Sequence, residues 1–224
     1  MGRLDNVHRA SAQSLNLVDT VAVALLVTEN GFHAGMLTRA QPGHPLFFTH
    51  LCAYNHLLHD HAAPGDCHIW VSLNIDPYDA ELVVASCRLT VKKRGRNKFP
   101  YSFSSPKGFF DENMEHEEGP DKTGLTCATF VLGVFNAARV DLVRYNSWPI
   151  RPGDLDWRNY VMPLVRMPPD LICKVQNGEV EVSPRYHPLE VAGAAAIGRY
   201  PVRFRTARKY ARHIYEMLHQ HHII

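Results

Sequence analysis

Residues 21–40, VAVALLVTENGFHAGMLTRA, contain the pattern that decides the fold. An apolar and β-branched run ends at the turn tetrapeptide TENG, and a second apolar run follows it directly. Two such runs joined by a short turn that contains Gly predict a β-hairpin. The hairpin indicates that the fold begins with an antiparallel sheet.

Two further segments extend the predicted sheet. Residues 46–58, LFFTHLCAYNHLL, are predicted to form one buried strand, although their apolar pattern alone also allows a helix. Residues 67–75, CHIWVSLNI, are rich in branched and aromatic side chains and predict a fourth strand.

Helices are expected after the sheet. Asp76 and Pro77 supply a cap and a first-turn residue for a helix that runs to Gly95. Apolar side chains at helical spacing predict a buried helix that begins near Thr126, with Thr123 or Thr126 as its cap. The intervening residues 97–122 are rich in Pro and Gly and predict a long loop, a length typical of functional or mobile segments.

The C-terminal part is expected to add a short helix near Asp156, a hairpin at residues 171–182 around an Asn-Gly pair, and helices at residues 189–197 and 202–219. The chain is therefore predicted to be α+β: an antiparallel sheet packs against the helix that carries Cys127 at its N-terminus, and the C-terminal helices belong to the same domain.

The composition excludes several classes of protein. The 224 residues are 46% hydrophobic and 21% charged, which is typical of a globular domain. A net charge of +2 lacks the clustered positive excess of a general nucleic-acid binder, so no nucleic-acid partner is expected. No apolar run approaches the roughly 20 residues that cross a bilayer, so no membrane insertion is expected. Five cysteines without paired spacing, and no apolar N-terminal run, predict a cytoplasmic protein.

Cys127 is the candidate nucleophile because it falls in the first turn of a predicted buried helix. Backbone N–H groups and the helix dipole favour a thiolate there, and the same N–H groups can hold an oxyanion. His50 in the preceding strand is the candidate base, and His56 on the same strand face is a rival. Because free cysteine is often buried, a purely structural role for Cys127 is the alternative. The other cysteines are predicted to be core residues: Cys52, Cys67, Cys87 and Cys173.

The order of HLCAYNH at residues 50–56 and TGLTCATFVLGVF at residues 123–135 resembles the circularly permuted papain-like hydrolases related to the NlpC peptidases. The resemblance implies a single permuted papain-like domain over residues 1–224, with a C-terminal helical extension. It implies a cysteine peptidase, amidase or acyl transferase that forms an acyl-enzyme.

The same resemblance implies roles for particular residues. Cys127 would be the nucleophile, His50 the base and His68, from the next strand, the third catalytic residue. The segment FPYSF at residues 99–103 resembles the aromatic loop beside the active site of permuted relatives, so Tyr101 is expected to contact the substrate, together with Thr126. The expected partner is a peptide, amide or other acyl substrate, and no metal or other cofactor is expected.

Two other functions remain open from the sequence. The cluster His56, His59, Asp60 and His61 contains metal-ligating side chains, which suggests a metal-binding hydrolase or module centred on His56, His59 and His61. It lacks the HExxH or paired CxxC spacing that is typical of zinc sites. The third possibility is a catalytically inactive papain-like domain that binds a partner.

Overall fold

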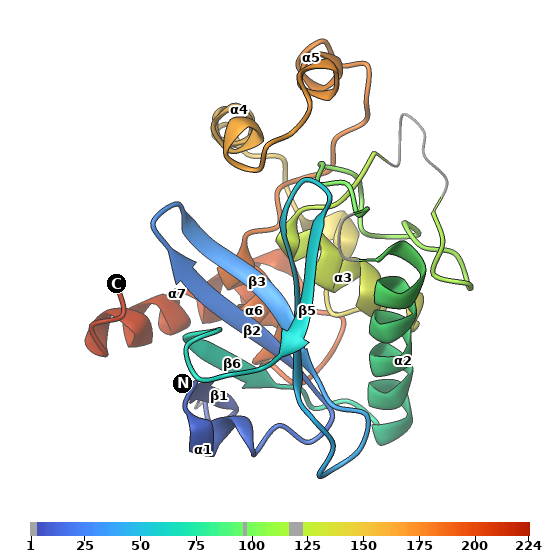
Figure 1. Ribbon diagram of the computed structural model, residues 1–224. Coiled ribbons are helices and arrows are strands. Elements are labelled where there is room, and N and C mark those ends of the chain that lie inside the picture. The colour runs from blue at the N-terminus through green and yellow to red at the C-terminus, as the bar shows by residue number, and fades with distance from the viewer. Residues whose placement is uncertain (1–3, 96–97, 117–122) are drawn as a thin grey trace.

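The computed structural model describes residues 4–95, 98–116 and 123–224. Its described residues form an α+β fold with a six-stranded antiparallel sheet in the order β1-β6-β2-β3-β4-β5 (Figure 1). The strands are β1 (Val7–Arg9), β2 (Val21–Thr28), β3 (Gly31–Thr38), β4 (Phe47–Ala53), β5 (His56–His61) and β6 (Ile69–Ser72).

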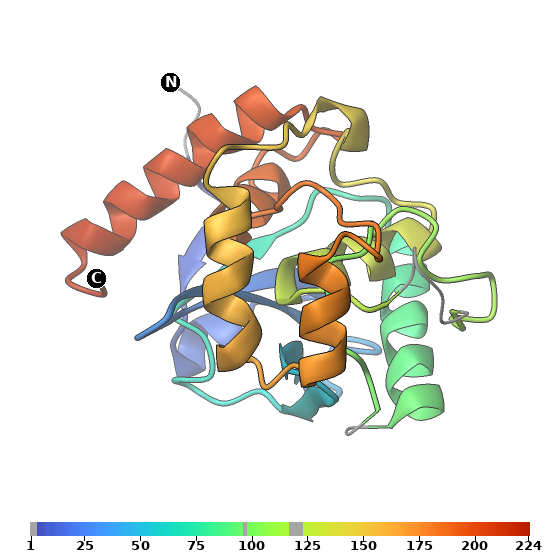
Figure 2. The ribbon, with the colours of Figure 1, turned by 90° about the horizontal axis from the view of Figure 1, so that it is seen from above.

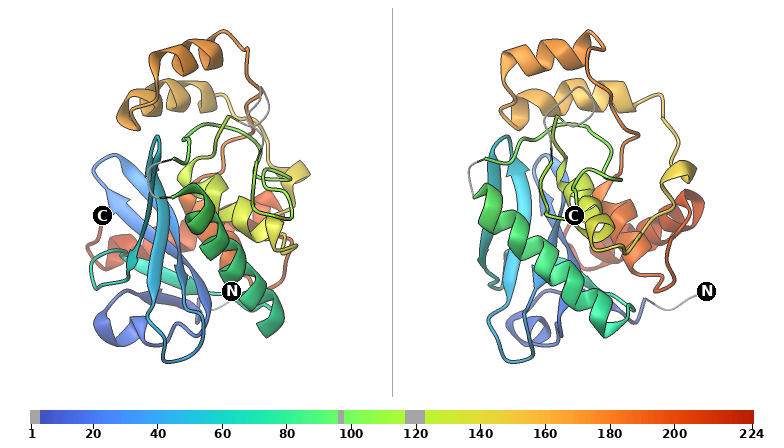
Figure 3. Two further views of the ribbon diagram at one scale, coloured as in Figure 1. Left: turned by 45° about the vertical axis from the view of Figure 1, so that its right-hand side comes forward. Right: turned by 90° about the vertical axis from the view of Figure 1, so that its right-hand side faces the viewer.

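Most of the helices cover one face of the sheet and one end of the molecule, whereas α1 lies on the other face. Their bounds are α1 (Ala12–Leu15), α2 (Pro77–Arg94), α3 (Cys127–Ala137), α4 (Asp154–Leu164), α5 (Pro169–Gln176), α6 (Pro188–Ala195) and α7 (Phe204–Gln220), with a short 3-10 helix at Tyr145–Ser147. Helices α2, α3 and α6 contact the sheet, and α7 packs on α6. Helices α4 and α5 stand beyond the strand ends, as Figures 2 and 3 show from above and from the side.

The hairpin predicted from residues 21–40 is confirmed. Strands β2 and β3 pair in antiparallel register from Val21 opposite Thr38 to Thr28 opposite Gly31. Alternation divides the hairpin between the two faces, because Val23 and Leu25 join the core under the helices. Ala22 and Ala24 face the opposite side, where they pack with Leu15 of α1 and with Trp70.

Residues 46–58 do not form one strand. They contain β4, a turn and the first part of β5, and Asn55 takes the left-handed conformation at that turn with φ 54°. The turn was not predicted from LCAYNHLL because Asn is the only turn-forming residue in this segment. The expected fourth strand is present but shorter, as β6.

Helices α2 and α3 agree with the sequence prediction. Asp76 caps α2, and Pro77 is its first residue. Thr126 caps α3, so of the two threonines proposed it is not Thr123. Residues 98–116 contain no helix or strand apart from an isolated bridge at Tyr101, and the remainder of the predicted loop, residues 97 and 117–122, lies outside the described residues.

The hairpin predicted at residues 171–182 is wrong, because helix α5 occupies Pro169–Gln176. Pro169 opens this helix, Asn177 is its C-cap, and Gly178 follows with φ 73°. An Asn-Gly pair serves a hairpin turn and a helix C-terminus equally well, since both need a left-handed residue. The helix expected near Asp156 begins at Asp154, and both predicted C-terminal helices are present as α6 and α7.

Helix α7 is amphipathic and completes the core on the far side of α6. Gly193 of α6 permits this packing, because an added Cβ would lie 2.7 Å from the Ala211 nitrogen. No helix in the described ranges is long and apolar enough to cross a membrane. The buried stripe of α7 consists of Phe204, Ala207, Ala211, Ile214 and Leu218.

Candidate active site

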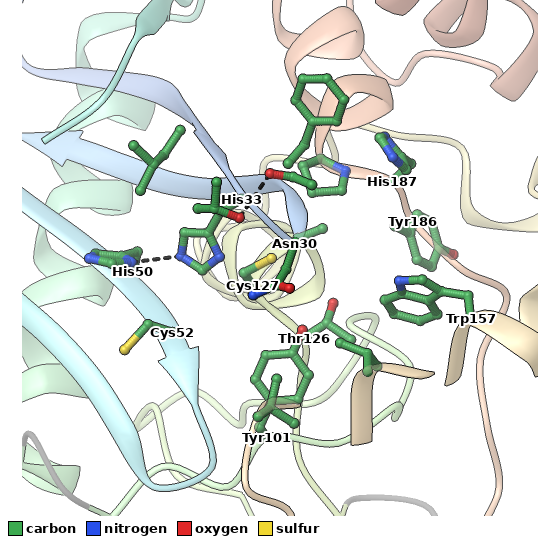
Figure 4. Close-up of a pocket in the computed structure, with 18 of the residues that line it drawn as sticks. Asn30, His33, His50, Cys52, Tyr101, Thr126, Cys127, Trp157, Tyr186 and His187 are labelled. Atoms are coloured by element: carbon green, nitrogen blue, oxygen red, sulfur yellow. Dashed lines mark hydrogen bonds between the residues drawn. The ribbon is translucent and has the colours of Figure 1, made fainter. Parts of the chain in front are cut away.

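A cavity of about 500 Å³ lies where the N-terminus of α3 meets β3 and β4. Four of the residues selected from the sequence line it: Cys127, His50, Tyr101 and Thr126 (Figure 4). A histidine that the sequence analysis did not select, His33 of β3, lines it as well.

Cys127 reaches the cavity because β3 and β4 separate. Their ladder pairs Thr38, Leu37 and Met36 of β3 with β4 and ends at the pair Met36–Thr49. Beyond that pair, the backbone N–H of Ala34 faces the Cys127 thiol and acts to lower its pKa. The sulfur therefore lies where the β3–β4 ladder has ended, beside a backbone N–H of β3 that would pair with β4 if the ladder continued.

The first turn of α3 directs further donors at the same sulfur. Thr126 and Thr129 form a capping box, in which the Thr129 amide donates to Thr126 Oγ1 over 3.1 Å and the Thr126 amide donates to Thr129 Oγ1 over 2.7 Å. The amides of Cys127 and Ala128 point to the Cys127 sulfur. The expected anion-stabilising helix terminus is thus present around this thiol.

Tyr101 is held beside Cys127 by backbone pairing of two segments that lack regular secondary structure. The Ser102 amide donates to the Leu125 carbonyl over 3.1 Å, and the Leu125 amide donates to the Pro100 carbonyl over 3.2 Å. Gly124, at φ 144°, allows this approach because a Cβ there would overlap the Pro100 carbonyl. The Tyr101 hydroxyl lies beside the Cys127 thiol and acts to lower its pKa.

His33 and His50 form a hydrogen-bonded pair from neighbouring strands. His33 Nε2 lies 2.6 Å from His50 Nδ1. Figure 4 shows the His33 ring between the His50 ring and the Cys127 sulfur. Since Nε2 is used by His50, Nδ1 is the ring nitrogen of His33 that remains for the thiol. The sequence feature that could have identified His33 is its place in the predicted strand that precedes the strand of His50.

Gly35 permits the close approach of His50 to β3, so Gly35→Ala should disturb the pair. An added Cβ would lie 2.9 Å from His50 Cβ and 2.5 Å from Phe48 Cε2. We expect a loss of about 1–3 kcal/mol in the free energy of unfolding, measured by urea titration. Gly153→Ala is the control, because a Cβ there meets nothing within 4 Å. Equal stability of Gly35→Ala and the wild type would contradict this packing.

Burial keeps both histidines neutral near pH 7. It lowers the pKa of His33 to about 4. It also lowers the pKa of His50 to about 3, and the neighbouring His33 adds to that shift. His187, on the other side of the cavity, has its pKa lowered to about 4 by burial and then by the nearby Arg185 and Arg151.

Burial also acts on the thiol, against the expectation that the helix terminus favours a thiolate. Cys127 is only 6% exposed. Burial raises its pKa, and the nearby amides of Ala34 and Ala128 and the Tyr101 hydroxyl counter only part of that rise. The resting site therefore holds a neutral thiol beside a neutral imidazole.

Acid should destabilise the fold because these histidines are buried in the neutral form. The unfolded chain takes up protons near pH 6.5, whereas His33 and His187 in the folded chain do so near pH 4. The free energy of unfolding therefore falls as the pH falls through this interval. We expect it to be at least about 2 kcal/mol lower at pH 4.5 than at pH 7, with a smaller difference in His33→Gln. Urea titrations that give equal stability at both pH values would contradict the burial of neutral histidines.

His68, expected as the third catalytic residue, lies elsewhere. Its Nδ1 accepts a hydrogen bond from the Val27 amide over 3.0 Å, and His68 is not among the residues that line the cavity. The reason is strand order, because the segment after His68 forms β6, which pairs with β2 and not with β4. His33 occupies the place beside His50 that was expected for His68. The rival base His56 is exposed at the start of β5 and also does not line the cavity.

The histidine cluster of β5 is not assembled as a metal site. His59 and His61 both stack on Phe47, with ring centroids 4.6 Å apart in each case. His59 Nδ1 also lies 2.7 Å from Thr49 Oγ1. Strand alternation places His56 on the other face. Across the described residues, no group of three or more His, Cys, Asp or Glu side chains is arranged to hold a metal ion.

The opposite wall of the cavity is largely apolar and aromatic. Trp157, Val161 and Val165 come from α4 and the residue that follows it, and Tyr186 and His187 precede α6. His187 Nδ1 accepts a hydrogen bond from the Leu189 amide, which fixes its ring at the start of α6. The cavity thus has a polar wall around the sulfur, and the opposite wall is suited to contact an apolar group of a ligand.

Comparison with known protein families, curated proteins and solved structures finds no match to this chain.

Proposed function

We propose that the protein is a cysteine-dependent hydrolase or acyl transferase that acts on an amide, peptide or related acyl bond. Cys127 is the nucleophile, His33 is the general base, and His50 orients His33. The observation that carries the proposal is the alignment of Cys127, His33 and His50 along one wall of an accessible cavity. His33 takes the role expected for His50 because it lines the cavity together with Cys127, and its other ring nitrogen is hydrogen-bonded to His50.

In the first step, His33 Nδ1 accepts the thiol proton as the Cys127 sulfur attacks the substrate carbonyl carbon. A sulfur–carbon bond forms, and the carbonyl π electrons move to oxygen. The imidazolium that results donates from Nε2 to His50 Nδ1, 2.6 Å away. A neutral His33 is ready to act as a base at pH 7 because its pKa is lowered to about 4.

The oxyanion is held by the donors that surround the sulfur. The amides of Cys127 and Ala128 and the Tyr101 hydroxyl are directed at this point in the resting enzyme, and such donors stabilise a tetrahedral intermediate. Collapse of the intermediate breaks the bond to the leaving group, which takes the proton from His33. The product is a thioester on Cys127, and a water or another acceptor then attacks it after giving a proton to His33.

The resemblance to circularly permuted papain-like hydrolases supports the same proposal. In that superfamily a histidine strand precedes the cysteine helix, and His33 and His50 both precede Cys127 in the same way. The aromatic segment around Tyr101 also lies at the cavity, as the resemblance implies for the substrate loop. We therefore propose membership of this superfamily, with a peptidase, amidase or acyl transferase activity.

A burst assay tests the proposal. Mixing the protein with 4-nitrophenyl butanoate should release about one equivalent of nitrophenolate per protein rapidly, followed by slower turnover, since acyl-enzyme formation precedes its hydrolysis. Protein whose thiols have first been blocked with iodoacetamide is the control. The absence of both burst and turnover would support a catalytically inactive binding domain instead.

A further inference from the structure

Arg185 presents a charged group at the aromatic end of the cavity. It lies between α5 and α6 and lines the cavity together with Trp157 and Tyr186. Its guanidinium carbon lies 4.3 Å from the centroid of the Trp157 ring. Burial raises the pKa of Tyr101, and Arg185 opposes that rise, so this cation lies close to the hydroxyl beside the sulfur.

Asp154 and Glu190, the acidic side chains that act on Arg185, are bound by another arginine. Arg151 contacts Asp154 over 3.3 Å and Glu190 over 2.6 Å. Glu190 also accepts hydrogen bonds from the Trp148 indole and the His187 amide. Among the described residues, no carboxylate forms a salt bridge with Arg185.

Arg151 also fixes the backbone at this position. Its second terminal nitrogen donates to the Arg185 carbonyl over 2.5 Å. The Arg185 side chain is therefore anchored at its base by an ion-pair cluster and at its tip by the Trp157 ring. Because the guanidinium is already held in place, it loses little conformational entropy when it binds a ligand.

The hydrogen-bonding capacity of Arg185 is not used within the described chain. Its Nε is buried and lacks a hydrogen-bond partner. Buried polar groups in proteins nearly always have partners, and a planar guanidinium matches the two oxygens of a carboxylate. Because Nε is closed to solvent, an anion bound in the cavity would pair with the terminal nitrogens of the Arg185 guanidinium.

We infer that the substrate carries a carboxylate, which Arg185 binds beside Trp157 while the scissile acyl group lies at Cys127. This inference rests on the proposed function and names its substrate class. A carboxylate fits better than a phosphate because Arg185 is the one cation lining the cavity in the described chain, given that His33, His50 and His187 are neutral near pH 7. The remaining carbon skeleton of the substrate would lie against the apolar wall.

Calorimetric titration at pH 7 tests the inference. The protein is the Cys127→Ala variant, which prevents turnover, and the ligands are 3-phenylpropanoate, 3-phenylpropanamide and 2-phenylethylphosphonate. We expect the carboxylate to bind at least tenfold more tightly than the amide and more tightly than the phosphonate. Arg185→Gln in the same background should remove the preference, and Arg185→Lys should retain part of it. Arg88→Gln, at an exposed arginine of α2 outside the cavity, should leave it unchanged.

Equal binding of the carboxylate and the amide, or binding of neither, would overturn the inference, and tighter binding of the phosphonate would overturn the assignment to a carboxylate. The comparison of ligands on the Cys127→Ala protein does not require Arg185→Gln to fold. It is also independent of catalysis, so a missing burst with a retained carboxylate preference would remove the proposed function and leave the anion site.

Discussion

Replacing Cys127 with alanine is expected to reduce ester hydrolysis by at least about 1000-fold, because the variant lacks the group that forms the acyl-enzyme. The nitrophenolate burst should disappear completely, since it counts acylated sulfur. Labelling by iodoacetamide at this position should also be lost. Burst amplitude and intact mass after labelling provide the two measurements.

Cys52→Ala is the matched control for this experiment. Cys52 lines the same cavity, but its sulfur donates to the His56 carbonyl over 3.3 Å and it does not begin a helix. We expect the burst of this variant to equal that of the wild type. A burst that survives in Cys127→Ala, or one that is lost in Cys52→Ala, would show that the nucleophile has been misassigned.

Replacing His33 with alanine is expected to slow acylation by about 100-fold to 10,000-fold, the range typical of a lost general base. His50→Gln should have a smaller effect, about tenfold to 100-fold, because the base remains and only its orienting partner is changed. The rate of the burst phase, measured by stopped flow under single-turnover conditions, separates these effects from later steps.

His56→Ala is the control for the histidine series, because His56 is exposed and outside the cavity. Its burst rate should match that of the wild type. If the burst phase of His50→Gln were slower than that of His33→Ala, His50 would be the base, as the sequence predicts. A harmless His33→Ala would remove this residue from the mechanism.

Local patterns predicted a large part of the fold. The β2–β3 hairpin and helices α2 and α3 follow from alternation, turn residues and capping residues that are neighbours in the sequence. The errors also have local causes. Asn55 forms a turn without Gly, and the Asn177-Gly178 pair ends a helix where a hairpin was expected.

The candidate site was only partly predictable because it depends on strand order. Cys127 and Thr126 could be selected from a helix start, and Tyr101 from the resemblance of residues 99–103 to a substrate loop, and the structure places all three at one cavity. The partner of His50 could not, since β6, the strand that follows residues 46–58, lies beside β2, whereas β3 lies beside β4. The pairing of β6 with β2 joins segments that are far apart in the chain, and no local pattern specifies it.

The protonation state of the site is a second property that the sequence did not define. A cysteine at a helix N-terminus predicts a lowered pKa, but the burial of Cys127 raises it. Burial also lowers the pKa values of His33 and His50. Attack by sulfur is therefore expected to be concerted with proton transfer to His33, and no ion pair forms in the resting enzyme.

The most direct test of the account is to locate the acyl group after a single turnover. The protein is mixed with 4-nitrophenyl butanoate, quenched in acid and digested, and the peptides are analysed by mass spectrometry. The account predicts a hydroxylamine-sensitive butanoyl thioester on Cys127 in the wild type, and much slower accumulation of it in His33→Ala. A butanoyl group on another residue, or formation of the Cys127 thioester at the same rate without His33, would contradict it.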